Sequence, residues 1–244
     1  MDRFHLACDG ERIAAVGLPP AAGRAGSPPL TALALHGAGD SHQGLLAGLL
    51  ADFAAHGCRA LALDFSGHGA SSGRLGELSL ERRLRQAADL VDRRAGAGPL
   101  VLVGFSMSGH TVADLAARYG ARVRAIGLCA PAVYAGEAWP LPFGTGFTEV
   151  IRRPGSWRDS PALASFRAFG GRSVLAVPGR DEVIPPEVTE AVAGALGERS
   201  ALTRLDLPHA EHRLGRWFAA HPRERRRFVA AVLGRGTGGG PAVG

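Results

Sequence analysis

Two amino acids are missing from this sequence of 244 residues: lysine and asparagine do not occur, so all 28 basic side chains are arginine. The absence of lysine excludes a P-loop lysine and any Schiff base, including the attachment of pyridoxal phosphate. The absence of asparagine excludes a Cys-His-Asn protease triad and N-linked glycosylation. The few cysteines, Cys8, Cys58 and Cys129, lie far apart without CxxC spacing. We therefore expect neither a disulfide framework nor a zinc site.

Long hydrophobic runs are missing as well. No stretch approaches the roughly 20 apolar residues that a membrane-spanning helix requires, so we expect no membrane association. The first residues, MDRFHLACDGERIAAVG, interrupt their apolar positions with Asp9, Glu11 and Arg12, which leaves no hydrophobic region of a secretory signal. The sequence therefore predicts a cytoplasmic protein.

The composition, with 46% hydrophobic and 20% charged residues, is typical of a folded globular chain, and the length suits one domain. A net charge of +6 raises the question of nucleic acid binding. Such binding requires a focused basic patch, whereas the arginines here are scattered along the chain. Their densest run, at 223–227, falls in a helical pattern and fits the solvated face of that helix. We expect no nucleic acid partner.

Six apolar blocks of strand length alternate with segments of helical periodicity. The blocks are LTALALHG, CRALALDF, GPLVLVGFS, VRAIGLCAP, SVLAVPG and ALTRLDLP, and the helical segments include 45–55, 80–94, 112–119 and 188–196. Continuously apolar strands indicate burial on both faces, and intervening helices indicate right-handed crossovers between parallel strands. The sequence thus predicts an α/β fold, with a mostly parallel twisted sheet and helices on both faces.

Two segments break this alternation at its ends. Residues 17–29, GLPPAAGRAGSPP, combine glycine, proline and serine, so a loop should follow an opening hairpin. The tail GRGTGGGPAVG has a similar composition, and we expect disorder over 236–244. One domain should then span 1–235.

Chemistry in such sheets gathers in the loops that follow the carboxyl ends of the strands. The third block ends in G-F-S-M-S-G, which places Ser106 between a strand and a helix with small residues around it. This is the pattern of a nucleophile elbow, in which a strained turn projects the hydroxyl above the sheet. Gly104 fits the motif G-x-S-x-G, whereas Ser108 stands where the motif has its second glycine. Alternatively, Ser106 is an ordinary helix N-cap.

An acid and a histidine follow Ser106 in the chain order Ser…Asp…His of hydrolases with this elbow. Asp181 comes just after the block SVLAVPG, where it is a candidate triad acid or a turn residue that caps the next helix. His209 and His212 share the loop after the last block, and either could reach the serine; we favour His212. No carboxylate or cysteine cluster accompanies this pair, so we expect no metal site.

A backbone oxyanion hole requires one amide from the residue after the nucleophile and one from the loop after an earlier strand. Met107 and Ala38 are the candidates. The glycines beside Ala38 allow that loop to approach a substrate closely. His36, at the start of the same loop, is expected to support the loop through a hydrogen bond and not to act as a base.

These residues resemble the α/β-hydrolase superfamily, in particular its small serine esterases and S33-aminopeptidase-like members. The matching motifs are H-G-A-G, D-F-S-G-H-G-A-S, G-F-S-M-S-G, G-R-D-E-V-I-P and A-E-H-R-L, in this order along the chain. The resemblance implies the α/β-hydrolase fold, gives the loop from Asp64 to Ser71 a role in shaping the sheet edge, and makes His68 structural. An acidic residue before the histidine is also similar to family members and favours His212.

The resemblance further implies a short cap or lid inserted at about 131–170, where the alternation lapses. Aromatic side chains gather in this stretch, among them Trp139, Phe143, Phe147 and Trp157. They are candidates for the wall of a substrate pocket, because aromatic side chains offer large apolar areas. Equally, they could simply pack the insertion onto the body of the protein.

These observations together predict a serine hydrolase that cleaves a carboxylic ester or thioester of a small, largely apolar acyl substrate through an acyl-enzyme. Ser106 is the nucleophile, His212 the general base and acid, and Asp181 the group that orients the imidazole, and no cofactor is needed. The alternatives are an acyltransferase or thioesterase of a biosynthetic pathway, an aminopeptidase, and a catalytically silent ligand-binding module.

Overall fold

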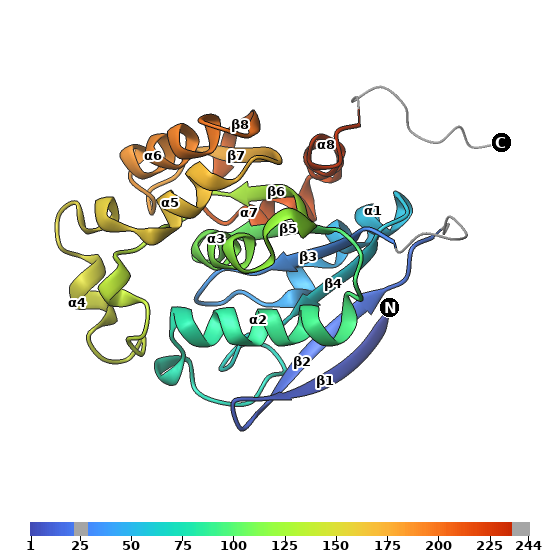
Figure 1. Ribbon diagram of the computed structural model, residues 1–244, viewed down its shortest axis with the longest axis horizontal. Coiled ribbons are helices and arrows are strands. Elements are labelled where there is room, and N and C mark those ends of the chain that lie inside the picture. The colour runs from blue at the N-terminus through green and yellow to red at the C-terminus, as the bar shows by residue number, and fades with distance from the viewer. Residues whose placement is uncertain (22–28, 236–244) are drawn as a thin grey trace.

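Eight strands form one sheet in the computed structural model, which describes residues 1–21 and 29–235 (Figure 1). Their order across the sheet is β1-β2-β4-β3-β5-β6-β7-β8. The strands are β1 (Asp2–Cys8), β2 (Glu11–Leu18), β3 (Thr31–Leu35), β4 (Arg59–Leu63), β5 (Leu100–Phe105), β6 (Val123–Cys129), β7 (Arg172–Arg180) and β8 (Ala201–Glu211). The strands from β3 onward pair in parallel, and β1 and β2 form an antiparallel hairpin that joins the sheet through β4. The predicted tail at 236–244 and most of the predicted loop at 17–29 lie outside the described residues.

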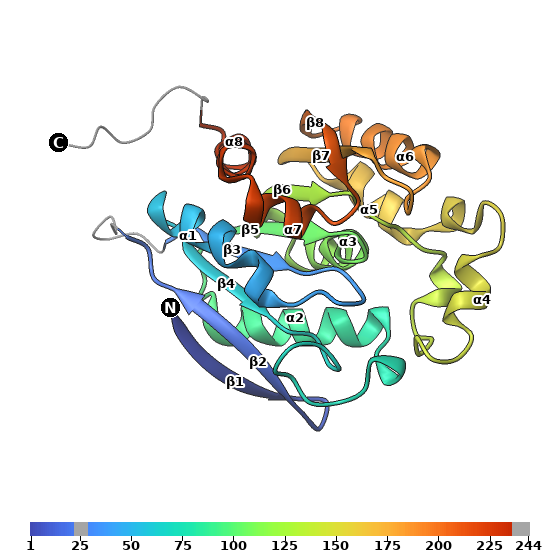
Figure 2. The ribbon, with the colours of Figure 1, turned by 180° about the vertical axis from the view of Figure 1, so that it is seen from behind.

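Helices cover both faces of this sheet, as Figures 1 and 2 show from opposite sides. One face carries α2 (Leu80–Arg94), α3 (Ser108–Tyr119), α5 (Pro161–Ala168) and α6 (Pro186–Gly197). The other face carries α1 (Ala47–Ala55), α7 (Leu214–Ala220) and α8 (Pro222–Val232). The predicted α/β fold is thereby confirmed. No helix of the described residues combines the length and the apolar character needed to cross a membrane.

The central strands are apolar at nearly every position because both of their faces are buried. In β3, Leu33 and Leu35 enter the core beneath α2 and α3, whereas Ala32 and Ala34 enter the core beneath α1 and α8. Successive side chains of a strand point to opposite faces, so one uninterrupted apolar run supplies two hydrophobic cores. For this reason an uninterrupted apolar run in the sequence predicts a central strand.

The strand order reverses at β3, which has β4 on one side and β5 on the other. The loops that leave the carboxyl ends of β3 and β5 therefore turn toward opposite faces and leave a crevice between them. This position brings the loop at His36 and the turn at Ser106 together. Gly37 marks the closeness of the two segments, because a Cβ atom on it would lie 3.2 Å from the Cβ of Ser106.

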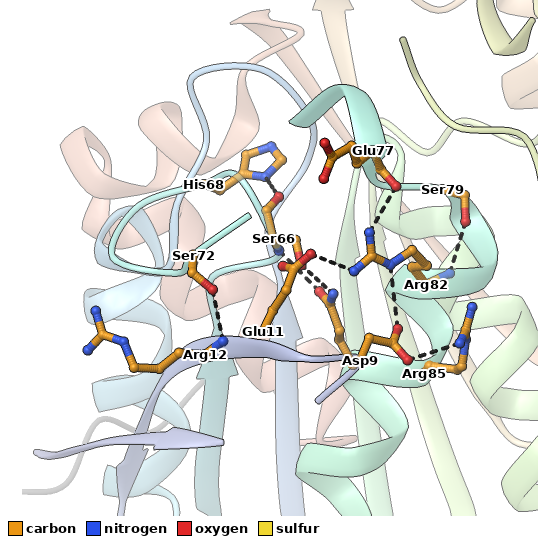
Figure 3. Close-up of polar contacts among 11 residues, drawn as sticks. Asp9, Glu11, Arg12, Ser66, His68, Ser72, Glu77, Ser79, Arg82 and Arg85 are labelled. Carbon is orange, nitrogen blue, oxygen red and sulfur yellow. Dashed lines mark hydrogen bonds and ion pairs between the residues drawn. The ribbon is translucent and has the colours of Figure 1, made fainter. Parts of the chain in front are cut away.

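The hairpin of β1 and β2 is attached to the start of α2 by ion pairs (Figure 3). Arg82 contacts both Asp9 and Glu11, and Arg85 contacts Asp9 at 2.9 Å. Ser79 caps the helix, because its hydroxyl accepts a hydrogen bond from the amide of Arg82. These contacts fix the rotation of the first turns of α2 about the helix axis.

The segment at 131–170, expected to be a cap, divides into two parts. Its second part, α5, packs on α3 and α6 and belongs to the helix layer of the sheet. Its first part includes α4 (Phe147–Ile151) and forms a small separate core at the periphery of the molecule in Figure 1. That core also contains Leu80 and Met107, so it packs directly behind the turn at Ser106.

A hydrogen bond from Trp139 Nε1 to Asp114 Oδ2, 3.0 Å long, fastens this small core to α3. Burial raises the pKa of Asp114 from 3.8 to about 6. The carboxyl proton of Asp114 is therefore bound more tightly in the folded chain than in the unfolded chain. As a result, the contribution of Asp114 to the free energy of unfolding falls as pH rises from 3.8 to about 6.

We predict that Asp114→Asn stabilises the protein by roughly 2 kcal/mol at pH 8, because the amide keeps an acceptor for Trp139 and carries no buried charge. The gain should shrink toward zero near pH 4, where Asp114 of the unchanged protein is also neutral. Urea unfolding of both proteins between pH 4 and pH 8 measures the difference. A gain that does not depend on pH would contradict the explanation.

Candidate active site

Ser106 lies in a sharp turn between β5 and α3 and has a φ of +50°. This left-handed conformation is strained for a residue with a side chain, and such strain concentrates at functional sites. The turn is held by its neighbours: the Ser106 carbonyl accepts hydrogen bonds from Gly109 N and Ala132 N, and Ser106 N donates to Cys129 O. Gly104 is required here, because a Cβ atom on it would lie 2.5 Å from the carbonyl oxygen of Ser108. The geometry is that of the predicted elbow and not of an N-cap.

The structure brings Ser106, His212 and Asp181 together in one hydrogen-bonded chain. His212 Nε2 lies 2.9 Å from Ser106 Oγ, and His212 Nδ1 lies 3.0 Å from Asp181 Oδ2. Asp181 follows the end of β7 directly and His212 follows the end of β8, so the parallel sheet aligns all three groups at one edge. The side chains of Asp181 and His212 are only 11% and 16% exposed, which protects the bond between them from water.

The Asp181 carboxylate contacts both the histidine and its own turn, but it does not cap the next helix, because the N-cap of α6 is Pro185. Its Oδ2 faces His212, while its Oδ1 accepts hydrogen bonds of 2.9 Å from the amides of Val183 and Ile184. The turn thus orients the carboxylate toward the histidine before any substrate is present.

The other candidate histidine lies elsewhere. His209 belongs to β8 itself and lines a surface groove with Trp217 and His221, outside the cavity beside Ser106. His212 comes one residue after the strand ends, where the chain turns over the sheet edge toward the serine. Of the two histidines that the sequence offered, His212 is the one within hydrogen-bonding distance of Ser106.

The loop after β3 carries one of the two predicted oxyanion donors, Ala38. His36 is fully buried, its Nδ1 lies 2.7 Å from the carbonyl oxygen of Gly37, and its Nε2 accepts from Phe65 N. The ring therefore carries its proton on Nδ1. Burial, with the nearby charge of Arg83, holds the pKa of His36 well below its usual range, so the ring stays neutral. His36 supports the loop, as expected.

The bond from His36 also sets the direction of the Ala38 amide. The Gly37 carbonyl and the Ala38 N–H belong to one trans peptide unit and point in opposite directions. Holding the carbonyl on the imidazole therefore turns the N–H toward the cavity. Ala38 and Met107 both line that cavity, and among the described residues neither amide donates a hydrogen bond. Both groups are free to bind an oxyanion.

The loop from Asp64 to Ser71 supports the wall of the cavity. The carboxylate of Asp64 accepts hydrogen bonds from Gln43 N at 2.7 Å and from Ala70 N at 3.0 Å. Asp64 thereby anchors the chain that leads to Leu45 and Leu46, which line the cavity. His68 is buried and its Nδ1 contacts Ser66 O, away from Ser106.

A cavity of about 330 Å³ opens beside Ser106. Its wall is largely apolar and comes from loops after β3, β7 and β8; the apolar side chains include Leu45, Leu46, Phe105, Ile184, Val183 and Leu214. Tyr134 is the aromatic side chain that the insertion contributes to it. Three described charged side chains, Asp40, Arg213 and Arg216, stand on its rim, and Asp40 pairs with Arg216 at 3.7 Å.

The four aromatic residues expected to line the pocket do not line it. Trp139, Phe143 and Phe147 pack with one another and with Leu80 in the small core of the insertion, and Trp157 packs against the core beneath α3. The second possibility from the sequence, that these side chains pack the insertion onto the body, describes their position. The physical reason is that the insertion has too little chain to bury its own apolar surface and uses these rings for that purpose.

Sequence reasoning missed the apolar residues that do form the wall. A usable signal exists for some of them, because Val183, Ile184 and Leu214 directly follow the predicted triad acid and histidine along the chain. Among the described residues no group of three or more His, Cys, Asp or Glu side chains could hold a metal ion.

The two histidines allow a direct test of this geometry. We predict that His212→Ala slows the reaction of Ser106 with a fluorophosphonate probe by about 1,000-fold or more, because the hydroxyl loses its proton acceptor. His209→Ala serves as the control and should react within about twofold of the unchanged protein. Labelling rates followed by intact-protein mass spectrometry give both values. A large loss in the His209 variant alone would reverse the assignment.

Comparisons with known proteins place the chain in a family. A family model described as serine aminopeptidase, S33, matches residues 26–157, which include Ser106 and both expected oxyanion donors. A search of curated proteins finds no match.

Solved structures share the fold over nearly the whole chain. The thioesterase domain from the curacin biosynthetic pathway is 17% identical, with a TM-score of 0.71 and 96% of this chain and 99% of that chain covered. Est1E from Butyrivibrio proteoclasticus, solved with ferulic acid bound, is 15% identical, with a TM-score of 0.70 and coverage of 95% and 100%. The enol-lactonase from Burkholderia xenovorans LB400 is 15% identical, with a TM-score of 0.69 and the same coverage. From the family match and this shared architecture, the chain belongs to the serine aminopeptidase S33 family of α/β-hydrolases and is a hydrolase.

Proposed function

We propose that the protein is a serine hydrolase that cleaves a carboxylic ester or thioester of a small, largely apolar acyl group through an acyl-enzyme. The observation that carries this proposal is the chain of hydrogen bonds from Ser106 through His212 to Asp181, which opens onto an apolar cavity. A hydroxyl bonded to an imidazole that is itself bonded to a carboxylate is the arrangement that activates a serine nucleophile.

The reaction follows from these contacts. Ser106 Oγ attacks the acyl carbon while His212 Nε2 accepts the hydroxyl proton, and the imidazolium is stabilised by Asp181. The tetrahedral intermediate collapses as the bond to the leaving alcohol or thiol breaks, and His212 returns the proton to that leaving group. A water molecule, deprotonated by His212, then attacks the acyl-enzyme and releases the acid and free Ser106.

The amides of Ala38 and Met107 supply the stabilisation of the oxyanion. Negative charge develops on the former carbonyl oxygen, and two backbone donors held in place before the reaction stabilise it without reorganisation. Loss of one such donor costs about 3 kcal/mol of barrier in comparable sites. The elbow and the loop after β3 each provide one of the two.

The rim of the cavity argues against a peptidase that recognises a free amino terminus. An ammonium group requires a carboxylate, and Asp40, the acid on the described rim, is 80% exposed to water and lies 3.7 Å from Arg216. Arg213 adds positive charge beside His212. The local charge therefore disfavours a cationic substrate and accepts a neutral or anionic one.

A thioesterase or acyltransferase in a biosynthetic pathway is the second candidate, and the similarity to the curacin thioesterase domain is the observation that favours it. Both reactions pass through the same acyl-enzyme and differ only in whether water or another nucleophile receives the acyl group. Product masses from a short acyl thioester, measured with and without an added alcohol, distinguish hydrolysis from transfer.

The serine mechanism predicts that Ser106→Ala lowers kcat for p-nitrophenyl butyrate by about 10,000-fold or more. The same variant should not react with a fluorophosphonate, and the unchanged protein should gain the mass of one probe at Ser106. Full ester hydrolysis by Ser106→Ala would overturn the proposal. An unchanged protein that neither hydrolyses esters nor takes up the probe would identify a silent ligand-binding module.

The rim charges predict discrimination against a substrate with a free amino group. The unchanged protein should hydrolyse N-acetylalanine p-nitrophenyl ester with a kcat/KM at least about 10-fold higher than that for alanine p-nitrophenyl ester, which has the same scissile bond and carries an ammonium group. Arg213→Gln is expected to narrow this gap by improving the substrate with the ammonium group, and Arg223→Gln, on α8, provides the matched control. A preference for the amino-terminal substrate in the unchanged protein would favour a peptidase instead.

A further inference from the structure

Ser108 departs from the G-x-S-x-G motif, and its side chain is fully buried. Its hydroxyl donates a hydrogen bond of 2.6 Å to the carbonyl oxygen of His36 and accepts one of 2.7 Å from Arg83 Nη2. The same Arg83 nitrogen donates to the His36 carbonyl at 2.8 Å. Three groups from three separate elements therefore bond to one another at one point. A glycine at position 108 could make neither of the two hydroxyl contacts.

The residues of this contact lie close in sequence to both oxyanion donors. Ser108 directly follows Met107, the first donor, and His36 lies two residues before Ala38, the second donor. The His36 carbonyl is held by Ser108 and Arg83, and the next carbonyl, that of Gly37, is held by the His36 ring. Two consecutive peptide units leading to the Ala38 amide are thus fixed, and one of the groups that fix them, Ser108, lies two residues after Ser106.

Arg83 is an unusual residue for such a buried position. It is 0% exposed, its guanidinium lies 3.7 Å from the ring centroid of Phe65, and no ion pair joins it to a carboxylate among the described residues. Its Nε and Nη1 have no hydrogen-bond partner there. Burial lowers the pKa of Arg83 to about 9, which leaves the side chain charged at neutral pH. Burying a cation without a counterion costs several kcal/mol.

The placement of α2 forces Arg83 into this costly position. Arg82 and Arg85, on the outward side of the helix, bind the acids of the hairpin, as Figure 3 shows. With the helix held by these contacts, Arg83 is directed inward to the His36 carbonyl and Ser108. A group that lowers stability and contacts the loops of a site is a candidate for a functional role.

We propose that Ser108 and Arg83 are positioning residues that hold the amides of Ala38 and Met107 at a fixed separation, as the two halves of the oxyanion hole. The inference rests on the proposed serine hydrolase function. It explains why serine is present where the motif has glycine: the hydroxyl connects the elbow to the loop after β3. Neither residue touches the substrate, so their effect is on the transition state and not on substrate binding.

The test compares Ser108→Ala with Ser173→Ala. Ser173 lies in β7, is equally buried and makes no side-chain hydrogen bond among the described residues, so it matches the loss of volume without touching the site. For p-nitrophenyl butyrate, Ser108→Ala should lower kcat about 10-fold with KM changed by less than about twofold. Ser173→Ala should stay within about twofold of the unchanged protein in both constants.

A second measurement separates positioning from a merely structural role. An alkylboronic acid adds to the serine hydroxyl as a tetrahedral anion that occupies the oxyanion hole, so it reports on the hole directly. Its inhibition constant should rise by about the same factor as kcat falls in Ser108→Ala, whereas a change in general stability would leave it unaltered. Ser108→Cys, which keeps the size but donates weakly, supplies the same comparison if the alanine variant does not fold.

The possible outcomes are distinct. Parallel losses in kcat and boronate affinity support the inference. A Ser108 variant with unchanged kcat, or with reduced kcat and unchanged boronate affinity, overturns it while leaving the proposed function intact, provided that Ser106→Ala is inactive. Activity that survives in Ser106→Ala, or no activity in the unchanged protein, overturns the proposed function and this inference with it.

Discussion

The site depends on one constraint of the sheet: β3 and β5 are adjacent parallel strands whose following loops diverge, and both strands are buried on both faces. Burial on two sides leaves the strands no freedom to shift, because a slip of one residue would exchange every side chain between the two cores. The carboxyl ends of β3 and β5 are therefore fixed relative to each other. The turn at Ser106 and the loop at Ala38 are thereby held at a fixed distance from each other, and β7 and β8 bring Asp181 and His212 to the same edge.

Hydrogen bonds from buried groups fix the loops whose strands the sheet has already positioned. Two peptide units of the loop after β3 are held by buried side chains, with His36 on the Gly37 carbonyl and Ser108 on the preceding one, and the Ser106 carbonyl is held by the amides of Gly109 and Ala132. Asp181 is held in the same manner by two amides of its own turn. Groups ordered in this way do not need to reorganise when charge develops, which is the main source of electrostatic catalysis. The arrangement exists before any substrate binds.

Much of this structure is predictable from sequence because its signals are local. The six apolar blocks are strands, and 80–94 is helical from the first residue to the last, since its periodicity and its capping Ser79 lie within one segment. Ser106, Asp181 and His212 could be selected because parallel strands bring their following residues to one edge. The sequence favours His212 over His209 only through the acidic residue before it, because periodicity does not reveal where β8 ends.

The features that escaped prediction depend on tertiary partners. An aromatic ring can line a pocket or fill a core with equal chemical suitability, and the outcome for Trp139 and Phe147 is decided by Leu80 and Met107, which are distant in sequence. The role of Ser108 is invisible without Arg83, 25 residues earlier. Buried polar contacts between separate elements have no periodic signature, so they appear only when the elements are seen together.

The small core of the insertion has a consequence for how this enzyme can change over time. Its rings pack with the side chain of Met107, which also lines the cavity, as does Tyr134; the rest of the cavity wall comes from residues outside this core. We therefore expect substitutions in the insertion to act mainly on the turn at Ser106, and so on all substrates alike. Changes in selectivity are expected instead from the loops after β3, β7 and β8, where a wall residue can be exchanged without disturbing that turn.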